Sequence, residues 1–491
     1  MKRAKVVARC PSPPPGERVR ERGRTSRHPL VLTLLLLNCA PLIAGPSRVL
    51  PPELQYDPAD YAGQPASRPT APPHRLTHPN GLEIFWDEDH SAPLVDVTLL
   101  VRCGRGDEPL GAPSLTTSLL WFALRAGAGS LDGPAQRRAF ERLGGSPDIT
   151  EDDGESWATV TVRTEDLPAA MALLRDALSS PRFEEPTLEI ERERRANALD
   201  APAAKHGQLA RRTRQRAIYG NVPALSQVQT AATLRTLTAA QLSTHASLCF
   251  QAPNLMLSVS GDVTEPTLRA AVAPFATLGG TTRVTHLPPA PTPTARWTWL
   301  VPSKVTNKVE VTLLGPGLAP GSPQRAAAQV LMAVIRSTLM SDLRDELGGI
   351  YSVTGDVDVG PGTGATWISF TTRSEVALET VRRALALLQS WWDRWPFDDQ
   401  LVDSVTKALQ RRVRSAPITE RTSAAARARM QDGEGFDART PDEQLAAVKF
   451  QDVRAFFVQA LRPDRVQVVV TGAFDPKLDW ASLGPVTHVE Q

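Results

Sequence analysis

Histidine and cysteine are scarce in this sequence, whose 491 residues include eight histidines and four cysteines. No C-x-x-C pair and no Cys/His cluster with metal-ligand spacing occurs, which argues against a zinc finger or a thiol redox motif. Beyond residue 50 only Cys103 and Cys249 remain. Two cysteines make no disulfide framework, so we expect both to be buried as small apolar side chains.

Signatures of a self-sufficient enzyme are missing as well. No Gly-x-Ser-x-Gly elbow marks a nucleophilic serine. His74 and His78 are the only histidines four residues apart, but prolines at positions 72, 73 and 79 exclude a helix and keep the two rings off a common face. We expect the other histidines of the body to be surface or capping residues: His90, His206, His245, His286 and His488.

The net charge of +2 is unevenly distributed along the chain. The first 50 residues carry ten Lys/Arg against two acids, which leaves 45 basic and 51 acidic residues in the remainder. The body is therefore mildly acidic and gives no reason to expect nucleic acid as a partner. Its 41% hydrophobic content can supply sizeable cores, which excludes a disordered or fibrous chain.

The N-terminal region 1–50 has the pattern of an export signal. Basic residues between positions 2 and 27 precede one apolar run, 29–44, which is too short to span a bilayer comfortably. We therefore expect an exported protein, periplasmic or associated with the cell envelope; a disordered basic tail is the alternative. Leu36-Leu37-Asn38-Cys39 loosely resembles a bacterial lipobox, which leaves a lipid anchor on Cys39 open.

The chain matches itself at an offset near 210 residues. Two matches have an offset of 210 and a third has an offset of 204, so the second copy carries about six extra residues, which we place around 359–364. Three ordered matches at nearly one offset indicate a duplicated unit. The matched residues are Trp157 with Trp367, Pro253 with Pro463, and Leu143 with Leu347.

Each copy has the same order of predicted elements, with adjacent strands and helices inserted between them. This order predicts two homologous α+β halves, each a mixed or antiparallel sheet flanked by helices, rather than a doubly wound parallel sheet. The predicted strands include 82–86, 95–102, 297–301 and 309–314, and the long helices are 114–126, 187–199, 324–347 and 398–413. The predicted divisions are a leader (1–50), an N-terminal half (72–283), a Pro-rich linker (284–296) and a C-terminal half (297–485).

Two weak motifs stand in order in the first half. Pro79-Asn80-Gly81-Leu82 precedes a strand, and Gly104 is followed four residues later by Glu108. In this order, and with two duplicated halves, residues 74–472 resemble the insulinase/pitrilysin (inverzincin) zinc-peptidase family. The resemblance implies two α+β halves joined by a linker that together form a half-shell.

The metal-binding motif of that family is missing from the first long helix. The family needs H-x-x-E-H there, because residues four apart share a helix face and the glutamate activates the zinc-bound water. Aligned on that motif, this chain has Ser114, Thr117 and Ser118 in place of His, Glu and His, and the third ligand position falls at or near Asp200. The resemblance therefore implies a degenerate site without zinc.

A segment of the second half retains another family pattern. Residues 341–352 resemble the Leu-Arg-Glu-x-x-Gly-x-x-Tyr-Ser segment, in which the Arg and Tyr reach towards the peptide backbone. Arg344 and Tyr351 keep that spacing, and both can donate hydrogen bonds to a carbonyl oxygen. The resemblance implies a substrate-binding role; the alternative is a helix C-terminal cation and an ordinary strand aromatic. The first half offers Phe140 and Pro147 at the matching positions.

A lost metal helix with a retained Arg/Tyr pair resembles the non-catalytic subunits of heteromeric members, such as the mitochondrial processing peptidase. The resemblance implies a homologous partner that bears H-x-x-E-H and holds the zinc, and a peptide or unfolded protein as substrate. No cofactor is expected in this chain. The glycine-rich loop of that enzyme's substrate-binding subunit is absent, and residues 334–338 occupy its approximate place. A non-proteolytic scaffold or assembly protein of the same fold is the alternative. A self-sufficient hydrolase is a third possibility, for which the sequence offers no independent enzyme signature.

Overall fold

The computed structural model describes residues 71–104, 108–109, 111–112, 114–151, 155–220, 222, 228–280, 292–347, 350–360 and 364–489. The leader with Cys39, most of the Pro-rich linker, and His286 lie outside these residues, so the expectations on them stay predictions. No helix in the described ranges is both long enough and apolar enough to cross a membrane.

The first half contains one six-stranded mixed sheet, in the order β1-β2-β6-β3-β5-β4. Only the β2–β6 pair is parallel. The strands are β1 (His74–Thr77), β2 (Glu83–Glu88), β3 (Leu94–Val101), β4 (Asp148–Glu151), β5 (Ser156–Arg163) and β6 (Leu255–Gly261). The helices are α1 (Leu115–Ala123), α2 (Gly133–Arg142), α3 (Leu167–Ser179), α4 (Glu185–Asp200), α5 (Pro202–Tyr219), α7 (Ala231–Arg235), α8 (Ala239–Cys249) and α9 (Glu265–Val272).

The second half repeats this plan, with the sheet order β12-β7-β11-β8-β10-β9. Its sixth strand comes from the C-terminal end of the chain and runs parallel to β7, whereas β1 of the first sheet precedes β2 and is antiparallel to it. The strands are β7 (Trp297–Pro302), β8 (Lys308–Pro316), β9 (Ile350–Val357), β10 (Ala365–Arg373), β11 (Gln467–Gly472) and β12 (Val486–His488). The helices are α10 (Arg325–Leu347), α11 (Ala377–Asp393), α12 (Asp399–Ser415), α13 (Ile418–Asp432), α14 (Pro441–Ala446) and α15 (Phe450–Ala460).

The α+β prediction is confirmed, and so are the strands and long helices expected from the apolar patterns. The period of two along β3 explains how the first sheet buries both faces. Val97 and Leu99 enter the main core with α1, α3, α8 and α9, while Leu100 points to the opposite face. On β8, Val311 likewise enters the second main core. Side chains alternate along a strand, so each sheet has a second apolar face to cover.

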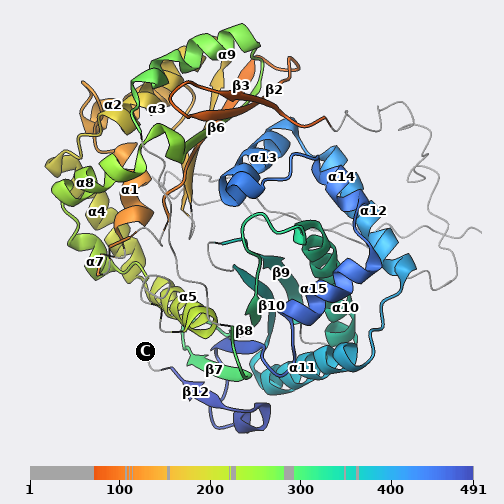
Figure 1. Ribbon diagram of the computed structural model, residues 1–491. Helices are drawn as coiled ribbons and strands as arrows, with labels where there is room; N and C mark the ends of the chain where they lie inside the picture. Colours follow the sequence, from red (N-terminus) through yellow and green to blue (C-terminus); the bar gives the residue numbers. More distant parts are fainter. Residues whose placement is uncertain are drawn as a thin grey trace, which may run out of the picture. The chain divides into compact units, whose positions relative to one another are not determined.

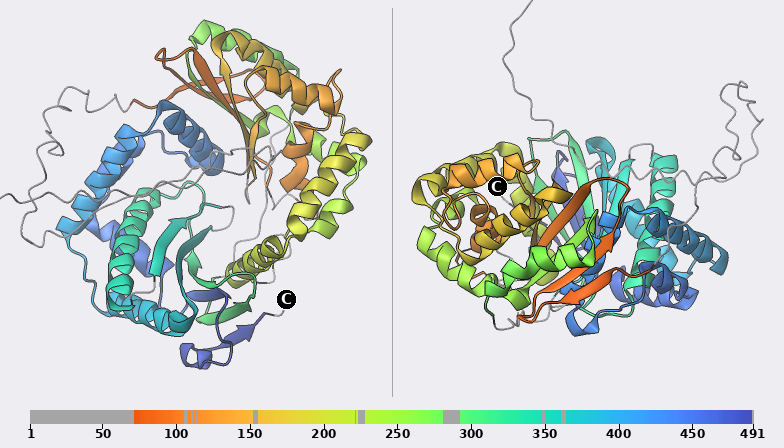
Figure 2. Two further views of the ribbon diagram at one scale, coloured as in Figure 1. Left: turned by 180° about the vertical axis from the view of Figure 1, so that it is seen from behind. Right: turned by 90° about the horizontal axis from the view of Figure 1, so that it is seen from above.

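Each of these second faces is covered by a helix from the other half. Helix α13 packs on β2 and β6 of the first sheet, where Met430 contacts the core around Phe85 and Leu100 (Figures 1 and 2). Helix α5, at the matching place in the first copy, packs on β7, β8 and β11 of the second sheet through Leu209 and Ile218. The exchange makes the stability of each half depend on a helix of the other.

Both exchanged helices are delimited by the same backbone signals. Ala201-Pro202 breaks the chain between α4 and α5, and Ala416-Pro417 does so before α13. Gly220 and Gly433 end the two helices in the left-handed region, with φ of 61° and 54°, which glycine adopts without steric cost. Each copy of the duplicated unit therefore contains one exchanged helix with the same start and end signals.

The extra residues of the second copy lie between β9 and β10 and at a bulge on β9. Trp157 pairs with Thr150, whereas its counterpart Trp367 pairs with Asp356, so the second hairpin is four residues longer. On the same strand pair, Thr371 faces Ser352 but Thr372 faces Ile350, which leaves Tyr351 as an inserted residue. A bulge of this kind bends the strand locally and redirects the side chain it carries.

Candidate substrate-binding site

The hydroxyl groups at the expected metal positions of α1 are fully buried and already hydrogen-bonded. Ser114 Oγ shares a 2.7 Å hydrogen bond with Thr233 Oγ1, and Ser118 Oγ accepts one of 2.8 Å from Gln229 Nε2. Both serines are 0% exposed. Thr117 lies between them on the same helix. The two serines thus join α1 to the segment around α7 by polar contacts, where the family would place imidazoles.

The start of α1 is fixed by a carboxylate from an earlier loop. Ser114 is the N-cap residue, but its side chain makes no capping bond because it is directed to Thr233. Glu108 Oε1 instead accepts a 2.9 Å hydrogen bond from the backbone N–H of Thr116. A carboxylate at a helix N-terminus accepts a hydrogen bond from an otherwise unpaired N–H, and its negative charge interacts favourably with the helix dipole. The Gly-x-x-x-Glu segment therefore positions this helix.

Asp200, the expected position of the third ligand, is the last residue of α4 and is committed to two cations. Its carboxylate accepts from Arg235 Nη1 at 2.8 Å and from Lys205 Nζ at 3.0 Å. The hydrogen bond from Arg235, and then that from Lys205, lowers the pKa of Asp200. Paired hydroxyl groups and an ion-paired carboxylate do not fit zinc, which takes imidazole, thiolate or free carboxylate.

Charged side chains from α2, α4 and the segment after α1 gather around Trp121 in the last turn of α1, which sequence reasoning missed. Glu191 of α4 is 1% exposed and accepts from Trp121 Nε1 at 3.4 Å, and Arg137 lies at 3.4 Å from the same carboxylate. The guanidinium of Arg125 stacks over Trp121 with its Cζ 3.7 Å from the ring centroid. Burial lowers the pKa of Arg125 to about 10, and the charge of Glu191 opposes that shift. Only the Glu-Arg-rich pattern of α4 hinted at such a cluster.

A pocket of about 290 Å³ lies beside α5 and the end of α4. It adjoins α1 through Gln229, the residue that donates to Ser118. Arg214, one of its lining residues, also lies 3.7 Å from Glu310, so the cavity reaches helix α5 where that helix meets the second sheet. Further lining residues include Glu151, Leu199, Gln208 and Arg211. Its lining therefore mixes charged, amide and apolar side chains.

Arg344 and Tyr351 lie on consecutive elements of the second half. Arg344 is exposed in the last turn of α10, and Tyr351 is 57% exposed near the start of β9. Lys308 Nζ lies 5.0 Å from the centre of the Tyr351 ring. Strand β9 forms an edge of its sheet, and Tyr351 is the bulged residue. Both donors are therefore accessible, while their role in substrate binding stays a prediction.

Two expectations about single residues were wrong. Cys103 and Cys249 are buried as expected, but they form a disulfide across 146 residues, with Cα atoms 5.6 Å apart. His245 was expected at the surface or in a cap, yet it is 3% exposed and shares a 2.7 Å hydrogen bond with Thr116 Oγ1. Neither feature has a local signature, because both depend on contacts between segments far apart in the sequence.

The comparisons with known proteins agree with this geometry. Residues 236–403 match the family model described as Peptidase M16 inactive domain. This segment of the chain is therefore similar to a peptidase M16 inactive domain. The resemblance to the insulinase family in its non-catalytic form is thereby confirmed. Among curated proteins, no relative matches the sequence.

Solved structures share the M16 fold over most of this chain. The M16 inactive domain of Pseudomonas fluorescens has a TM-score of 0.71 and 18% identity, and the match covers 82% of this chain and 99% of that one. The first half of the periplasmic protease PqqL from Escherichia coli has a TM-score of 0.67 and 16% identity, covering 83% and 93%. The ferredoxin protease FusC, in complex with Arabidopsis ferredoxin, has a TM-score of 0.62 and 17% identity, covering 82% and 45%.

Proposed function

We propose that this chain is the non-catalytic subunit of a heteromeric zinc peptidase, and that it binds peptide and completes the active site of a homologous H-x-x-E-H partner. The observation that carries the proposal is the state of α1. Ser114 and Ser118 occupy metal-ligand positions in a fold that is otherwise intact on both sides of the duplication. A chain of this fold without ligands needs a second chain to hydrolyse a peptide.

The lengths of the relatives support a two-chain enzyme. This chain spans 93% of the first half of PqqL but only 45% of FusC. One such chain therefore corresponds to about half of a long M16 protease. In the proposed complex, the other half is supplied by a separate, zinc-bearing subunit.

Arg344 and Tyr351 are the proposed substrate contacts. A guanidinium and a phenol can both donate to a peptide carbonyl, and neither needs a metal in its own chain. Strand β9 is an edge strand, a position at which an extended peptide can pair with the sheet, and the bulge carries Tyr351. A peptide or an unfolded protein is the expected ligand, as the protein substrate in the FusC complex suggests.

Export to the periplasm or cell envelope is part of the proposal. The basic and apolar pattern of residues 1–50 has the form of an export signal, and PqqL is described as periplasmic. A lipid anchor at Cys39 would hold the complex at the membrane surface. Labelling with a fatty-acid analogue, compared between the natural chain and Cys39→Ser, tests the anchor.

The test of the function begins with the partner. The natively expressed protein is isolated, the co-purifying chain is identified by mass spectrometry, and the pair is co-expressed for cleavage of a quenched fluorescent peptide. We expect hydrolysis only with both chains present. Arg344→Ala and Tyr351→Phe should each lower kcat/KM by at least about tenfold, the loss expected for a transition-state donor. Unchanged turnover in both variants would show that the donor role is wrong.

Arg142→Ala is the matched control. Arg142 is an exposed arginine in the last turn of α2, the helix that precedes β4 as α10 precedes β9. Its removal deletes the same helix-terminal charge in the half where no donor is expected. We expect the Arg142→Ala complex to retain full activity.

The alternative is a scaffold or assembly protein that uses the same fold without proteolysis. The helix exchange favours it, because α5 and α13 join the two halves through apolar contacts that do not involve the positions expected for zinc. It predicts a stable complex whose partner lacks H-x-x-E-H and no hydrolysis with any partner. Identifying the co-purifying chain therefore discriminates between the two readings.

A further inference from the structure

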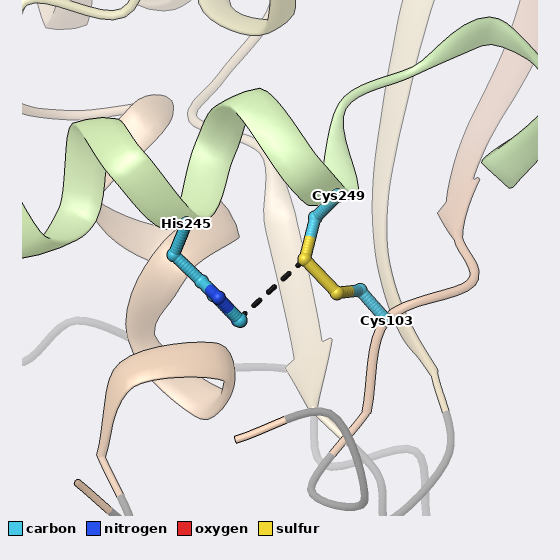
Figure 3. Close-up of side chains that lie close together, drawn as sticks. All are labelled: Cys103, His245 and Cys249. Carbon is cyan, nitrogen blue, oxygen red and sulfur yellow. Dashed lines mark hydrogen bonds between the residues drawn. A yellow bond between two sulfur atoms is a disulfide. The ribbon is translucent and has the colours of Figure 1, made fainter. Parts of the chain in front are cut away.

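Three potential metal ligands converge in the interior of the first half (Figure 3). Cys103 follows β3, and His245 and Cys249 lie on α8, four residues apart. Their ligand atoms lie within 4.8 Å of one another, and the residues are 1%, 3% and 0% exposed. Among the described residues, no other such group of His, Cys, Asp and Glu is found.

The helix explains why two of the three converge. Residues four apart on a helix lie on one face, so His245 and Cys249 point in the same direction. His245 Nε2 lies 3.5 Å from Cys249 Sγ. A disulfide between Cys103 and Cys249 needs no imidazole beside it. The ring, hydrogen-bonded to Thr116, therefore places a third potential ligand beside the two sulfur atoms.

We propose that Cys103, Cys249 and His245 form a zinc site when the disulfide is reduced. The chemistry of the donors suits this ion: two thiolates and a neutral imidazole are ligands that zinc prefers in tetrahedral protein sites. Two thiolate charges balance the charge of Zn²⁺, which allows the site to remain buried without a net charge. This site is separate from Ser114, Ser118 and Asp200.

The reaction balances with a dithiol or phosphine reductant. Two electrons and two protons convert the disulfide to two thiols, while a dithiol reductant becomes a disulfide or a phosphine takes an oxygen from water. Zn²⁺ then replaces the two thiol protons, which are released to solvent. The imidazole binds through Nε2, so its proton resides on Nδ1. In the disulfide form Nε2 shares a 2.7 Å hydrogen bond with Thr116 Oγ1, and this bond breaks when Nε2 binds zinc.

The consequence is a crosslink that survives both redox conditions. The disulfide joins the end of β3 to the end of α8, and zinc joins the same two points through its ligands. His245 also contacts Thr116 in the first turn of α1, whose N–H is held by Glu108. The hydrogen bond to Thr116 belongs to the disulfide form, whereas both forms of the crosslink join β3 to α8.

The experiment compares zinc binding by the oxidised and reduced full chain. Cys10→Ser and Cys39→Ser are introduced together, so that Cys103 and Cys249 are the only thiols. The chain is reduced with a phosphine, exchanged into oxygen-free buffer, and titrated with Zn²⁺ against a chromophoric chelator. We expect one equivalent of zinc in the reduced chain and none in the oxidised chain. A reduced chain that binds no zinc overturns the proposal.

Variants separate the ligands from the rest of the chain. Cys103→Ser should abolish tight binding, and His245→Gln, which keeps a buried hydrogen-bonding group, should weaken it at least about tenfold, the loss that even outer partners of a ligand cause. His90→Gln is the control, because His90 is an exposed histidine of the same half, paired with Asp262. Binding that is unaffected by both ligand variants overturns the site.

A spectroscopic measurement decides the matter even if His245→Gln does not fold. X-ray absorption at the zinc edge of the reduced chain should show two sulfur neighbours at about 2.3 Å and an imidazole nitrogen at about 2.0 Å. A shell without an imidazole contradicts the assignment of His245. A shell without sulfur contradicts the whole site.

Discussion

Arg429 of α13 donates two hydrogen bonds to Glu83 of β2, from Nε to Oε2 at 3.0 Å and from Nη2 to Oε1 at 2.8 Å. The side chains are only 14% and 18% exposed. A paired fork of this kind fixes geometry as well as charge. Because Glu83 belongs to the first half and Arg429 to the second, the pair fastens the exchanged helix to the sheet that it covers.

Replacing Glu83 by glutamine should therefore destabilise the protein. The guanidinium would remain largely buried without its counter-charge, and the expected loss is about 2 kcal/mol in the free energy of unfolding. Urea denaturation measures it. The control is Arg269→Gln, whose partner Glu265 lies one helical turn away in an exposed pair. That variant should change stability by less than about 0.5 kcal/mol, and an equal loss in both variants would contradict the special role of Glu83.

The same pair gives stability a dependence on pH. Burial acts to raise the pKa of Glu83, but the hydrogen bond and charge of Arg429, and then Arg75, outweigh it, so the pKa is lowered from 4.5. A lowered pKa in the folded state contributes stability above the unfolded value, and that contribution is lost as pH falls through the folded value. Between about pH 6 and about pH 3, Glu83→Gln should lose less stability than the natural chain.

Asp87 on the same strand should respond with the opposite sign. Burial raises its pKa above 3.8, although the hydrogen bond from Thr422 of α13 partly opposes the shift. A raised carboxyl pKa favours folding when the group is protonated, so its contribution falls as pH rises through that window. Asp87→Asn should therefore make the acid-induced loss of stability steeper. Parallel denaturation series of the two variants test both signs, and identical slopes would contradict both.

The disulfide should stabilise the first half in the absence of metal. Its two ends lie 146 residues apart, and closing so long a loop removes much conformational freedom from the unfolded chain. Cys103→Ser with Cys249→Ser should cost about 2 to 5 kcal/mol in metal-free buffer. Cys10→Ser with Cys39→Ser is the control and should leave the unfolding midpoint unchanged. An unchanged midpoint in the first pair would show that the crosslink carries no stability.

The sequence allowed the duplication and the α+β fold to be predicted, because both leave periodic marks. Trp157 and Trp367 mark the matching strands β5 and β10, which occupy the same position in the two sheets. The sequence pattern could not predict which helix packs on the second apolar face of each sheet. Leu209 and Met430 are recognisable as buried residues, yet nothing in their spacing says that each packs on the sheet of the other half.

The candidate site was predictable to a similar extent. The sequence alone shows serine at positions 114 and 118, where the family resemblance implies histidine, and a hydroxyl is a poor substitute for an imidazole on zinc. The partners of these hydroxyls, Thr233 and Gln229, lie more than a hundred residues away and emerge only from the fold. The buried position of His245 was missed for the same reason. Side-chain chemistry is local, whereas burial depends on contacts across the chain.

Matching glycines at the ends of β6 and β11 provide a test of the duplication itself. Gly261 and Gly472 have φ of +130° and +123°, and a Cβ at either position would lie 2.1 Å from a backbone oxygen, that of Leu94 or Lys308. Alanine at either site should cost about 3 kcal/mol, since the strain and the clash add. Gly207→Ala in α5 meets no atom within 4 Å and should instead stabilise by about 0.5 to 1 kcal/mol. If Gly261→Ala and Gly472→Ala both lower the urea midpoint while Gly207→Ala raises it, the two copies share one backbone requirement. An unchanged midpoint in either strand-end variant would mean that only one copy has that requirement.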